Sequence, residues 1–214
     1  MYKKKPFFIV FEGVEGCGKS YQSKKLFIKL KKNKIDTILT REPGGTKSSE
    51  LIRNLILKDY FTKNNKEKFD KYTDTLLYLA ERNENIKNKI KPALLKKKVV
   101  ICDRFIDSTI AYQVYGKKVD IEFINNIHKK ILGKIKPSLV FILKVSTKSS
   151  KLRLNKRKSK NRYDNFPQSF YTKAQKSFLK IAKNKKNYFI LNSSSNDNIL
   201  EKNIFNIVKK FLNI

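Results

Sequence analysis

Short apolar runs alternate with longer amphipathic segments along the whole chain. Continuous apolar runs of about four to eight residues are typical of strands that are buried on both faces of a sheet. Segments whose apolar positions recur every three or four residues predict helices that cover such a sheet. The apolar runs lie at residues 7–11, 36–40, 99–102, 139–143 and 188–191, and the helical patterns at 19–32, 49–57, 71–89, 106–115, 120–132, 166–183 and 199–212.

The alternation predicts the α/β class, with a five-stranded parallel sheet flanked by helices on both faces in three layers, α/β/α. A further short helix is expected after Pro92, because proline favours the start of a helix. No internal repeat and no linker-like stretch divides the 214 residues. We therefore expect a single domain over residues 1–214 with ample length for a buried core.

The first apolar run ends in a glycine-rich turn, which opens the first helical pattern. The spacing Gly13-x4-Gly18-Lys19-Ser20 matches the phosphate-binding P-loop. Glycines let the backbone curl so that successive N–H groups point at phosphate oxygens, and the following helix adds its partial positive charge. Lys19 can then reach the terminal phosphates, and Ser20 can ligate Mg²⁺. A glycine turn with a purely structural role is the alternative. The position of the motif between a strand and a helix favours the P-loop NTPase fold instead.

The net charge of +32 arises from 50 Lys+Arg against 18 Asp+Glu. Such a balance is typical of proteins that bind nucleic acid or an anionic surface. The lysines are scattered over nearly every segment, however, so we interpret most of the charge as solvated surface and expect no specific nucleic-acid partner. Weak, salt-sensitive binding to polyanions still follows. Against this lysine background the arginines indicate sites that need a bidentate fork, and they are Arg41, Arg53, Arg82, Arg104, Arg153, Arg157 and Arg162.

Three further features narrow the class of protein. No apolar run approaches the roughly 20 residues that span a bilayer, so no membrane partner is expected. Cys17 and Cys102 lack metal-ligand spacing and indicate reduced thiols in the cytoplasm. His128 is the only histidine and is followed by two lysines, so we expect it at the surface and propose no histidine-based catalytic set.

Charged residues follow two further strands at the edge where α/β sheets bind ligands. The loop 41–46 reads Arg-Glu-Pro-Gly-Gly-Thr, and by itself an ordinary Pro-Gly turn would explain it. Asp103 and Arg104 end the third apolar run, where an acid suits an Mg²⁺-bound water and an arginine suits a phosphate clamp. Tyr78 and Arg82 share one helix face, and alone they indicate an amphipathic helix with an arginine that extends to solvent.

Taken together, these segments resemble thymidylate kinase of the bacterial type over essentially the whole chain. The resemblance rests on five motifs in order, which are Phe-Glu-Gly-Val-Glu-Gly-Cys-Gly-Lys-Ser (11–20), Thr-Arg-Glu-Pro-Gly-Gly-Thr (40–46), Leu-Tyr-Leu-Ala-Glu-Arg (77–82), Asp-Arg-Phe-Ile-Asp-Ser-Thr-Ile-Ala-Tyr-Gln (103–113) and Asn-Arg-Tyr-Asp (161–164). It implies transfer of the γ-phosphoryl group of ATP to dTMP, giving dTDP and ADP, with Mg²⁺ as cofactor. It also implies a homodimer.

The resemblance further implies where ATP and the metal bind. Asp103 would help Ser20 to hold Mg²⁺ through water. Lys19 and Arg104 would act on the transferring group. The ATP phosphates would lie on the P-loop residues, which are Gly13, Val14, Glu15, Gly16, Cys17, Gly18, Lys19 and Ser20.

For dTMP, the resemblance implies a phosphate end and a base end. Glu42, Arg53 and Arg104 would line the phosphate end, and Glu15 would face the 3′-hydroxyl of the deoxyribose. At the base end Tyr78 would stack on thymine and Arg82 would hydrogen-bond it. The other contacts of the nucleoside would come from Thr109 and Gln113 at the polar edge of the base and from Tyr112, which would crowd the 2′ carbon.

The segment 146–164 is either a solvated basic helix or a mobile lid over anionic ligands. One branch of the family carries an arginine inside the P-loop, and residues 14–17 contain none here. The other branch supplies it from a lid, which corresponds to about 150–164. Arg153 and Arg157 are then candidate catalytic residues, and Arg162 is a candidate ATP contact. Which of them reaches the transferring group stays open.

Three alternatives remain beside thymidylate kinase. Another nucleoside monophosphate kinase would share the fold and the P-loop, although Tyr112 and Gln113 favour dTMP. A basic P-loop ATPase acting on nucleic acid would explain the charge. A nucleotide-binding protein without turnover is disfavoured by four intact residues, Lys19, Ser20, Asp103 and Arg104.

Overall fold

The structure is a computed structural model, and it describes residues 5–58, 68–156, 163, 166–194 and 197–214. Five strands form one parallel sheet in the order β2-β3-β1-β4-β5. This confirms the predicted α/β class and the number of strands. The strands are β1 (Phe7–Glu12), β2 (Thr37–Arg41), β3 (Val99–Asp103), β4 (Leu139–Lys144) and β5 (Tyr188–Asn192).

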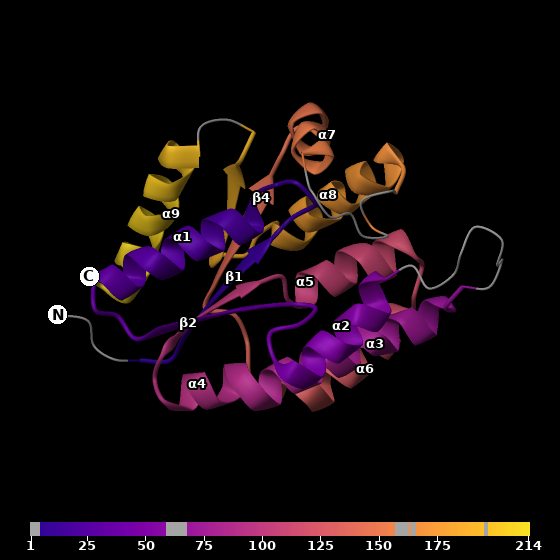
Figure 1. Cartoon of the computed structure of the whole chain (residues 1–214), viewed down its shortest axis with the longest axis horizontal. Coiled ribbons are helices and arrows are strands. Elements are labelled where there is room, and N and C mark those ends of the chain that lie inside the picture. Colours follow the sequence, from indigo (N-terminus) through magenta and orange to yellow (C-terminus); the bar gives the residue numbers. More distant parts are fainter. Residues whose placement is uncertain (1–4, 59–67, 157–162, 164–165, 195–196) are drawn as a thin grey trace.

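Helices cover both faces of the sheet, as Figure 1 shows. On one face α1 packs against β1, β2 and β3 and also contacts α9, whereas α4 and α8 pack on the other face. The helical elements are α1 (Lys19–Lys32), α2 (Lys47–Leu57), α3 (Lys71–Asn85), the π-helical turn η1 (Ile86–Ile90), α4 (Lys91–Leu95), α5 (Ile106–Thr109), the π-helical turn η2 (Ile110–Gly116), α6 (Ile121–Leu132), α7 (Thr147–Asn155), α8 (Gln168–Ala182) and α9 (Asp197–Leu212).

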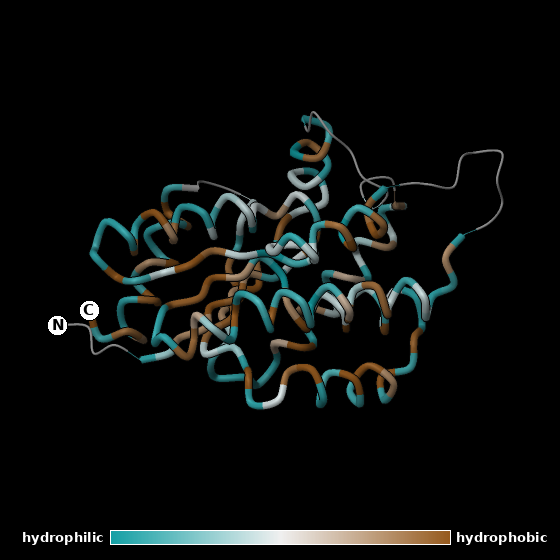
Figure 2. The backbone as a smooth tube through the Cα atoms, turned by 60° about the horizontal axis from the view of Figure 1, so that its bottom comes forward, coloured by the Kyte–Doolittle hydropathy of each residue, from teal (hydrophilic) through white to brown (hydrophobic). Residues whose placement is uncertain are grey.

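The core lies between these layers, where the apolar strands are brown in Figure 2. All six residues of β1 are buried, and β3 is buried along its whole length. A central parallel strand is covered on both faces, which explains why its sequence is continuously apolar and does not alternate. None of the helices in the described ranges combines the length and the apolar character needed to cross a membrane.

Two helical patterns end differently from the prediction. The helix that begins at Lys71 does not stop before Pro92 but continues through η1 into α4, where Pro92 lies in the first turn. A proline is tolerated there because its missing N–H is not needed in a first turn. The predicted helix 106–115 likewise passes from α5 into η2. Such π-helical turns are frequent at functional sites, and η2 carries two pocket residues, Tyr112 and Gln113.

The topology places the P-loop beside Asp103. β1 and β3 are neighbours, and Phe11 pairs with Asp103 in their register. The connection after β1 runs to one side of the sheet and the connection after β3 runs to the other. Ligands of open α/β sheets bind in the crevice outside the strand ends at such a point.

Candidate active site

The P-loop adopts the backbone conformation that its glycines allow. Gly13 has φ +138° and Gly16 has φ +71°, which are angles that other residues rarely adopt. Space is also restricted, because a Cβ on Gly16 would lie 2.8 Å from the carbonyl oxygen of Ser150. Lys19 is buried and its Nζ donates a 2.8 Å hydrogen bond to the carbonyl of Val14. The lysine therefore lies across the loop at the position where phosphate oxygens bind in P-loops.

Ser20 and Asp103 form a second feature beside the P-loop. The Ser20 hydroxyl donates a short hydrogen bond to Oδ2 of Asp103, which ends β3. The other carboxylate oxygen, Oδ1, is buried and has no hydrogen-bond partner among the described residues. A hydroxyl and a carboxylate with a free oxygen are hard ligands of the kind that Mg²⁺ prefers when phosphates and water complete its shell. The pair therefore fits the predicted metal site.

Arg104 is held in a strained and highly connected position. Its φ of +73° lies in the left-handed region. Its guanidinium donates to the carbonyl of Gly13 at 2.9 Å, to Ser108 Oγ at 3.0 Å and to Oε1 of Glu15 at 2.7 Å. Burial alone would lower the pKa of Arg104, but Tyr112 and Glu15 raise it well above its usual value. The side chain is a fixed cation at the edge of the P-loop.

Glu15 links Arg104 to Tyr112, whose hydroxyl donates to Glu15 Oε2. Burial would raise the pKa of Glu15, but Arg104 and Lys19 outweigh it and the pKa lies below its usual value. Glu15 is therefore an anion between two cations. The guanidinium of Arg104 also lies over the Tyr112 ring, 5.3 Å from its centroid.

An open pocket adjoins this cluster. It brings together the P-loop residues Lys19 and Ser20 with residues from β2, α2, α3, β3 and the segment after β3. Its lining includes every substrate residue that the sequence predicted, namely Glu15, Glu42, Arg53, Tyr78, Arg82, Arg104, Thr109, Tyr112 and Gln113. The motifs that lie far apart in sequence therefore meet around one cavity.

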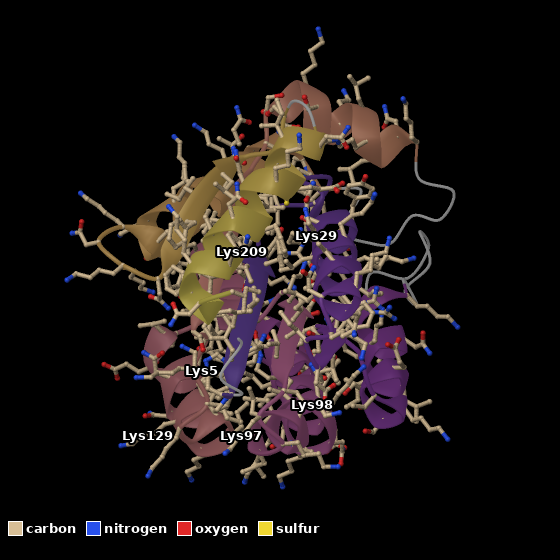
Figure 3. The ribbon with its side chains drawn as sticks, turned by 90° about the vertical axis from the view of Figure 1, so that its left-hand side faces the viewer. Lys5, Lys29, Lys97, Lys98, Lys129 and Lys209 are labelled. Carbon is tan, nitrogen blue, oxygen red and sulfur yellow. The ribbon has the colours of Figure 1, made fainter. Side chains whose placement is uncertain are left out.

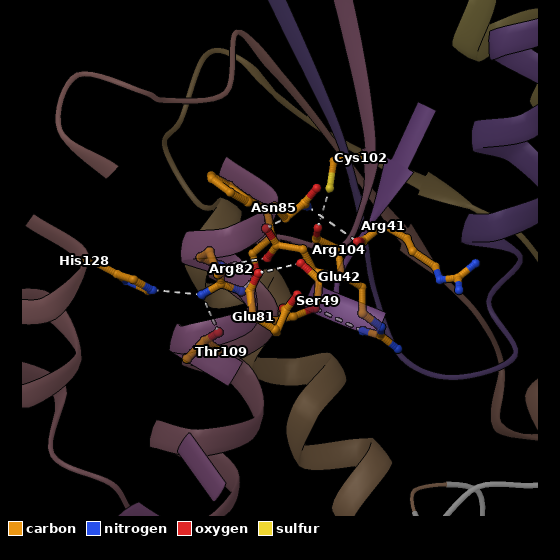
Figure 4. A network of polar contacts seen from close by, with 12 residues as sticks. Arg41, Glu42, Ser49, Glu81, Arg82, Asn85, Cys102, Arg104, Thr109 and His128 are labelled. Atoms are coloured by element: carbon orange, nitrogen blue, oxygen red, sulfur yellow. Dashed lines mark hydrogen bonds and ion pairs between the residues drawn. The ribbon is translucent and has the colours of Figure 1, made fainter. Parts of the chain in front are cut away.

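Arg82 is the centre of the buried network in Figure 4 and is 1% exposed. Its Nε donates to Glu42 Oε2 at 2.7 Å. One terminal nitrogen contacts Thr109 Oγ1 at 2.7 Å and His128 Nε2 at 2.8 Å, and the other donates to the carbonyl of Phe105 at 2.9 Å. These contacts use four of the five N–H groups of the guanidinium.

The expectation that His128 lies at the surface is wrong. His128 is 5% exposed, on the buried face of α6. Because a guanidinium can only donate, Nε2 must accept the hydrogen bond from Arg82, and the ring is neutral. Burial, followed by the charge of Arg82, lowers the pKa of His128 to about 3. Lys129 and Lys130, which follow it in the sequence, are exposed on the solvent face of the helix.

Two carboxylates surround Arg82 on its other side. Glu42 also accepts from Asn85 Nδ2 at 3.3 Å, and Glu81 Oε2 accepts from the backbone N–H of Gly44 at 2.9 Å. Burial would lower the pKa of Arg82, but Glu42 and Glu81 raise it. The charge of the guanidinium is therefore balanced by the protein before any ligand binds.

Two pocket residues have donors or rings available for a ligand. Gln113 is 1% exposed, and its Nε2 has no hydrogen-bond partner among the described residues. Tyr78 is half-buried on the pocket wall, with its ring 6.3 Å from the ring of Tyr163. Arg53 lies on the wall as well and donates to the carbonyl of Pro43. An aromatic ring can stack on a planar heterocycle, and an amide N–H that no described residue accepts can donate to its carbonyl groups.

Of the lid arginines, Arg153 lies within the described residues. It is on α7, and its Nη1 donates to the carbonyl of Gly16 at 3.3 Å. Ser150 on the same helix donates to the carbonyl of Glu15 at 2.8 Å. The beginning of the predicted lid therefore contacts the P-loop, whereas Arg157 and Arg162 lie outside the described residues.

Glu12 was not predicted as a site residue, and it is linked to Arg104 through the hydroxyl of Ser108. Its carboxylate accepts hydrogen bonds from the N–H groups of Phe105 and Ser108, and from the hydroxyl of Ser108. Burial, then the charge of Asp107, raises the pKa of Glu12 to about 8. The sequence did contain a signal for this residue, because Glu12 ends a continuously apolar strand. A carboxylate that is buried in such a position must be paired.

The comparisons with known proteins agree with one another. The family model for thymidylate kinase matches residues 11–204. The thymidylate kinase of Wolbachia sp. subsp. Brugia malayi (strain TRS) is 44% identical over 180 residues, which are 83% of this chain and 82% of that protein. The thymidylate kinase of Aster yellows witches'-broom phytoplasma (strain AYWB) is 40% identical over 209 residues, which are 96% of each protein.

A solved structure has the same fold over nearly its whole length. The crystal structure of thymidylate kinase from Ehrlichia chaffeensis matches with a TM-score of 0.74 at 31% identity, covering 95% of this chain and 99% of that one. The family match and these relatives favour the main prediction over the alternatives from sequence. The chain therefore belongs to the thymidylate kinase family, whose enzymes transfer a phosphoryl group from ATP to dTMP.

Proposed function

We propose that this chain binds ATP on the P-loop and dTMP in the adjoining pocket, and transfers the γ-phosphoryl group between them. The observation that carries the proposal is the buried Arg82 at the pocket wall, with one N–H that no described residue accepts. A fixed donor there favours a carbonyl oxygen of thymine over the amino group of cytosine, because an unpaired buried donor is costly.

The remaining base contacts follow from the same wall. Gln113 Nε2 would donate to a second carbonyl oxygen, and the Thr109 hydroxyl would contact the same polar edge. Tyr78 would stack on the ring. Tyr112, held by Glu15, would fill the space beside the 2′ carbon and disfavour a ribose hydroxyl. Glu15 would also face the 3′-hydroxyl.

The phosphate of dTMP would lie between Arg104 and Arg53, which are cations on the P-loop side of the pocket. Glu42, which the sequence analysis placed at this end, donates nothing to an anion and is engaged by Arg82 and Asn85. We propose that Glu42 contributes by fixing Arg82, and that the arginines supply the attraction for the phosphate.

Mg²⁺ would be held by Ser20 and, through water, by Asp103. The unpartnered Oδ1 of Asp103 and the adjacent hydroxyl fit this assignment. When bound, Mg²⁺ neutralises charge on the phosphates of ATP. No cluster of three histidine, cysteine or acidic side chains that could hold a metal occurs in the described part of the chain, which suits an ion bound mainly through phosphates and water.

The protein's own contribution to the reaction is alignment and charge. The phosphate oxygen of dTMP is already a nucleophile, so no general base is needed. Lys19 would leave the Val14 carbonyl for the phosphates of ATP, Arg104 would orient the acceptor phosphate, and Arg153 would stabilise charge from the lid side. Contributions from Arg157 and Arg162 stay predictions.

We further propose that the chain acts as a homodimer. Apolar side chains are exposed on neighbouring helices α2, α3 and α6, which lie together in Figure 1. The exposed fractions are 71% for Leu51, 43% for Leu55, 47% for Leu76 and 38% for Ile121. A patch of this kind is typical of a protein interface. A cytoplasmic location is proposed from the two buried free thiols, Cys17 and Cys102.

The pocket assignment can be tested by calorimetric titration with dTMP. Gln113→Leu removes the free donor at similar volume, and we expect dTMP affinity to fall about tenfold. Gln22→Leu is the matched control, because Gln22 lies on α1 outside the pocket and its buried amide has no hydrogen-bond partner among the residues that the structure describes. Equal dTMP affinity in both variants would contradict the assignment of Gln113 to the base.

A further inference from the structure

The lysines that are dispersed along the sequence gather at one edge of the folded chain. In a parallel sheet, the helices end and the connecting segments enter at the amino ends of the strands. Figure 3 looks at this end, where Lys5, Lys29, Lys97, Lys98, Lys129 and Lys209 lie across the surface. We call this end the lysine face and define it by the segments that enter the five strands and the end of α9, namely residues 5, 29–36, 96–98, 129–138, 183–187 and 209–214.

The lysine face is strongly and uniformly basic. These segments hold seventeen lysines and one acid, Asp36, which gives +16 of the chain's +32. Asp36 is paired with Lys98 at 3.1 Å. The lysines are Lys5, Lys29, Lys31, Lys32, Lys34, Lys96, Lys97, Lys98, Lys129, Lys130, Lys134, Lys136, Lys183, Lys185, Lys186, Lys209 and Lys210, all exposed except Lys98, which is half-buried.

Helix dipoles explain only part of this concentration. Lysines in the last turns of α1, α6 and α9 complement the partial negative charge at a helix C-terminus. That effect falls off within one turn. Lys5, Lys134, Lys136 and Lys186 lie outside the helices, in segments that lead into strands. Their charges repel one another at this edge and lower the stability of the free protein, unless a polyanion neutralises them.

We propose that the lysine face binds duplex nucleic acid through its phosphates without reading the base sequence. The five strands alone make an edge about 20 Å wide at about 4.8 Å per strand, and a duplex presents one charge per about 1.7 Å of its axis. About a dozen phosphates therefore fall within reach of the seventeen lysines. Sequence readout is not expected, because none of the seven arginines lies in these segments and base recognition relies on bidentate forks.

An anionic membrane fits the lysine face less well. Membrane-binding surfaces combine basic residues with large apolar side chains that enter the bilayer. Among the exposed large hydrophobic side chains of the described ranges, only Ile28 and Leu95 adjoin the face. The duplex would also leave the enzyme free to work, because the P-loop and the pocket lie at the carboxyl ends of the strands, at the opposite edge of the sheet.

The test compares two variants of equal charge in the full-length protein. The face variant carries Lys32→Gln, Lys96→Gln, Lys129→Gln and Lys186→Gln. The control variant carries Lys24→Gln, Lys47→Gln, Lys176→Gln and Lys202→Gln, which are exposed lysines outside the face. Both have a net charge of +28, four below the original +32. Binding to a mixed-sequence 30-base-pair fluorescent duplex is measured by anisotropy from 50 to 300 mM salt, beside dTMP phosphorylation.

The face variant should lose at least tenfold in duplex affinity at 100 mM salt, with a salt slope shallower by about one for each phosphate contact removed. The control variant should retain the original affinity within about twofold, and all three proteins should keep the same turnover. Equal loss in both variants would show diffuse attraction and overturn the proposal. Absence of duplex binding at 50 mM salt, or binding to phosphatidylserine vesicles but not to duplex, would also overturn it.

Discussion

The side chains that contact one another in the candidate site come from distant parts of the sequence. Arg82 contacts Glu42, Thr109 and His128, which lie on different elements. The sequence could place Arg82 and Thr109 because each is part of a local motif. It could not place His128, since a single histidine among lysines has no local signal for its partner.

Arg104 and Lys19 supply positive charge where phosphates would meet. Replacing either with Ala should lower turnover by about two to three orders of magnitude, since fixed charges that stabilise a transition state contribute that much. Both proteins should still unfold cooperatively, because neither side chain belongs to the hydrophobic core. Turnover and thermal unfolding of the two variants provide the check. A variant with near-normal turnover would remove that residue from the mechanism.

His128 should make the protein less stable in acid. The ring stays neutral in the folded state because its pKa is lowered to about 3, whereas the unfolded chain takes up a proton below about pH 6.5. The unfolded state therefore binds more protons, and the free energy of unfolding falls as the pH falls from about 6.5 towards 3, by up to about 1.4 kcal/mol per pH unit.

The variant His128→Gln keeps an acceptor for Arg82 but does not titrate. Urea unfolding at several pH values should show a flatter acid limb for this variant, with little change in KM for dTMP. Glu12, whose raised pKa of about 8 makes stability fall as the pH rises above about 4.5, contributes equally to both proteins and cancels in the comparison. Identical pH slopes in the two proteins would refute the role of His128.

At the level of the elements, the pattern of apolar runs was sufficient for the sheet. Continuous burial of β1 and β3 leaves a signal in the sequence itself, and α1 begins and ends where its periodicity indicated. The π-helical turns η1 and η2 were not predictable, because they arise from packing and have no residue signature of their own. For the lid, which begins at α7, the sequence indicated only the range of residues. Residues 157–162 lie outside the residues that the structure describes.

The contact between α7 and the P-loop gives a test at this scale. In Gly16→Ala the new methyl group would lie 2.8 Å from the Ser150 carbonyl oxygen, so α7 or the loop must shift. We expect turnover to fall at least tenfold, since catalysis depends on alignment to within about 1 Å. Gly133→Ala is the control, because Gly133 also has a positive φ of +55° but no neighbour within 4 Å of the added atom. Similar turnover in both variants would show that the contact is unimportant.

For the whole molecule, the sequence indicated the charge but not its arrangement. Lysines in six separate segments share one edge only because all five strands run in the same direction. The exposed apolar side chains on α2, α3 and α6 likewise come from three separate segments of the sequence.

The proposed homodimer predicts the effect of Leu51→Glu. A charge at the most exposed of these apolar side chains should convert a dimer into a monomer in light scattering, because a buried unpaired carboxylate disfavours association. Leu95→Glu changes an equally exposed leucine, 74% exposed on α4, and should leave the mass of the assembly unchanged. A monomeric original protein, or dimers for both variants, would contradict this interface.

The central claim is that one pocket combines P-loop phosphoryl transfer with recognition of thymine. Its most direct test is an ADP-release assay with ATP, Mg²⁺ and dTMP, dCMP, UMP or GMP in turn. The account predicts strong turnover with dTMP and turnover at least a hundredfold lower with each of the others. Comparable turnover with dCMP or UMP would contradict the assignment of Arg82, Gln113 and Tyr112, and would leave only the phosphate chemistry of the P-loop in place.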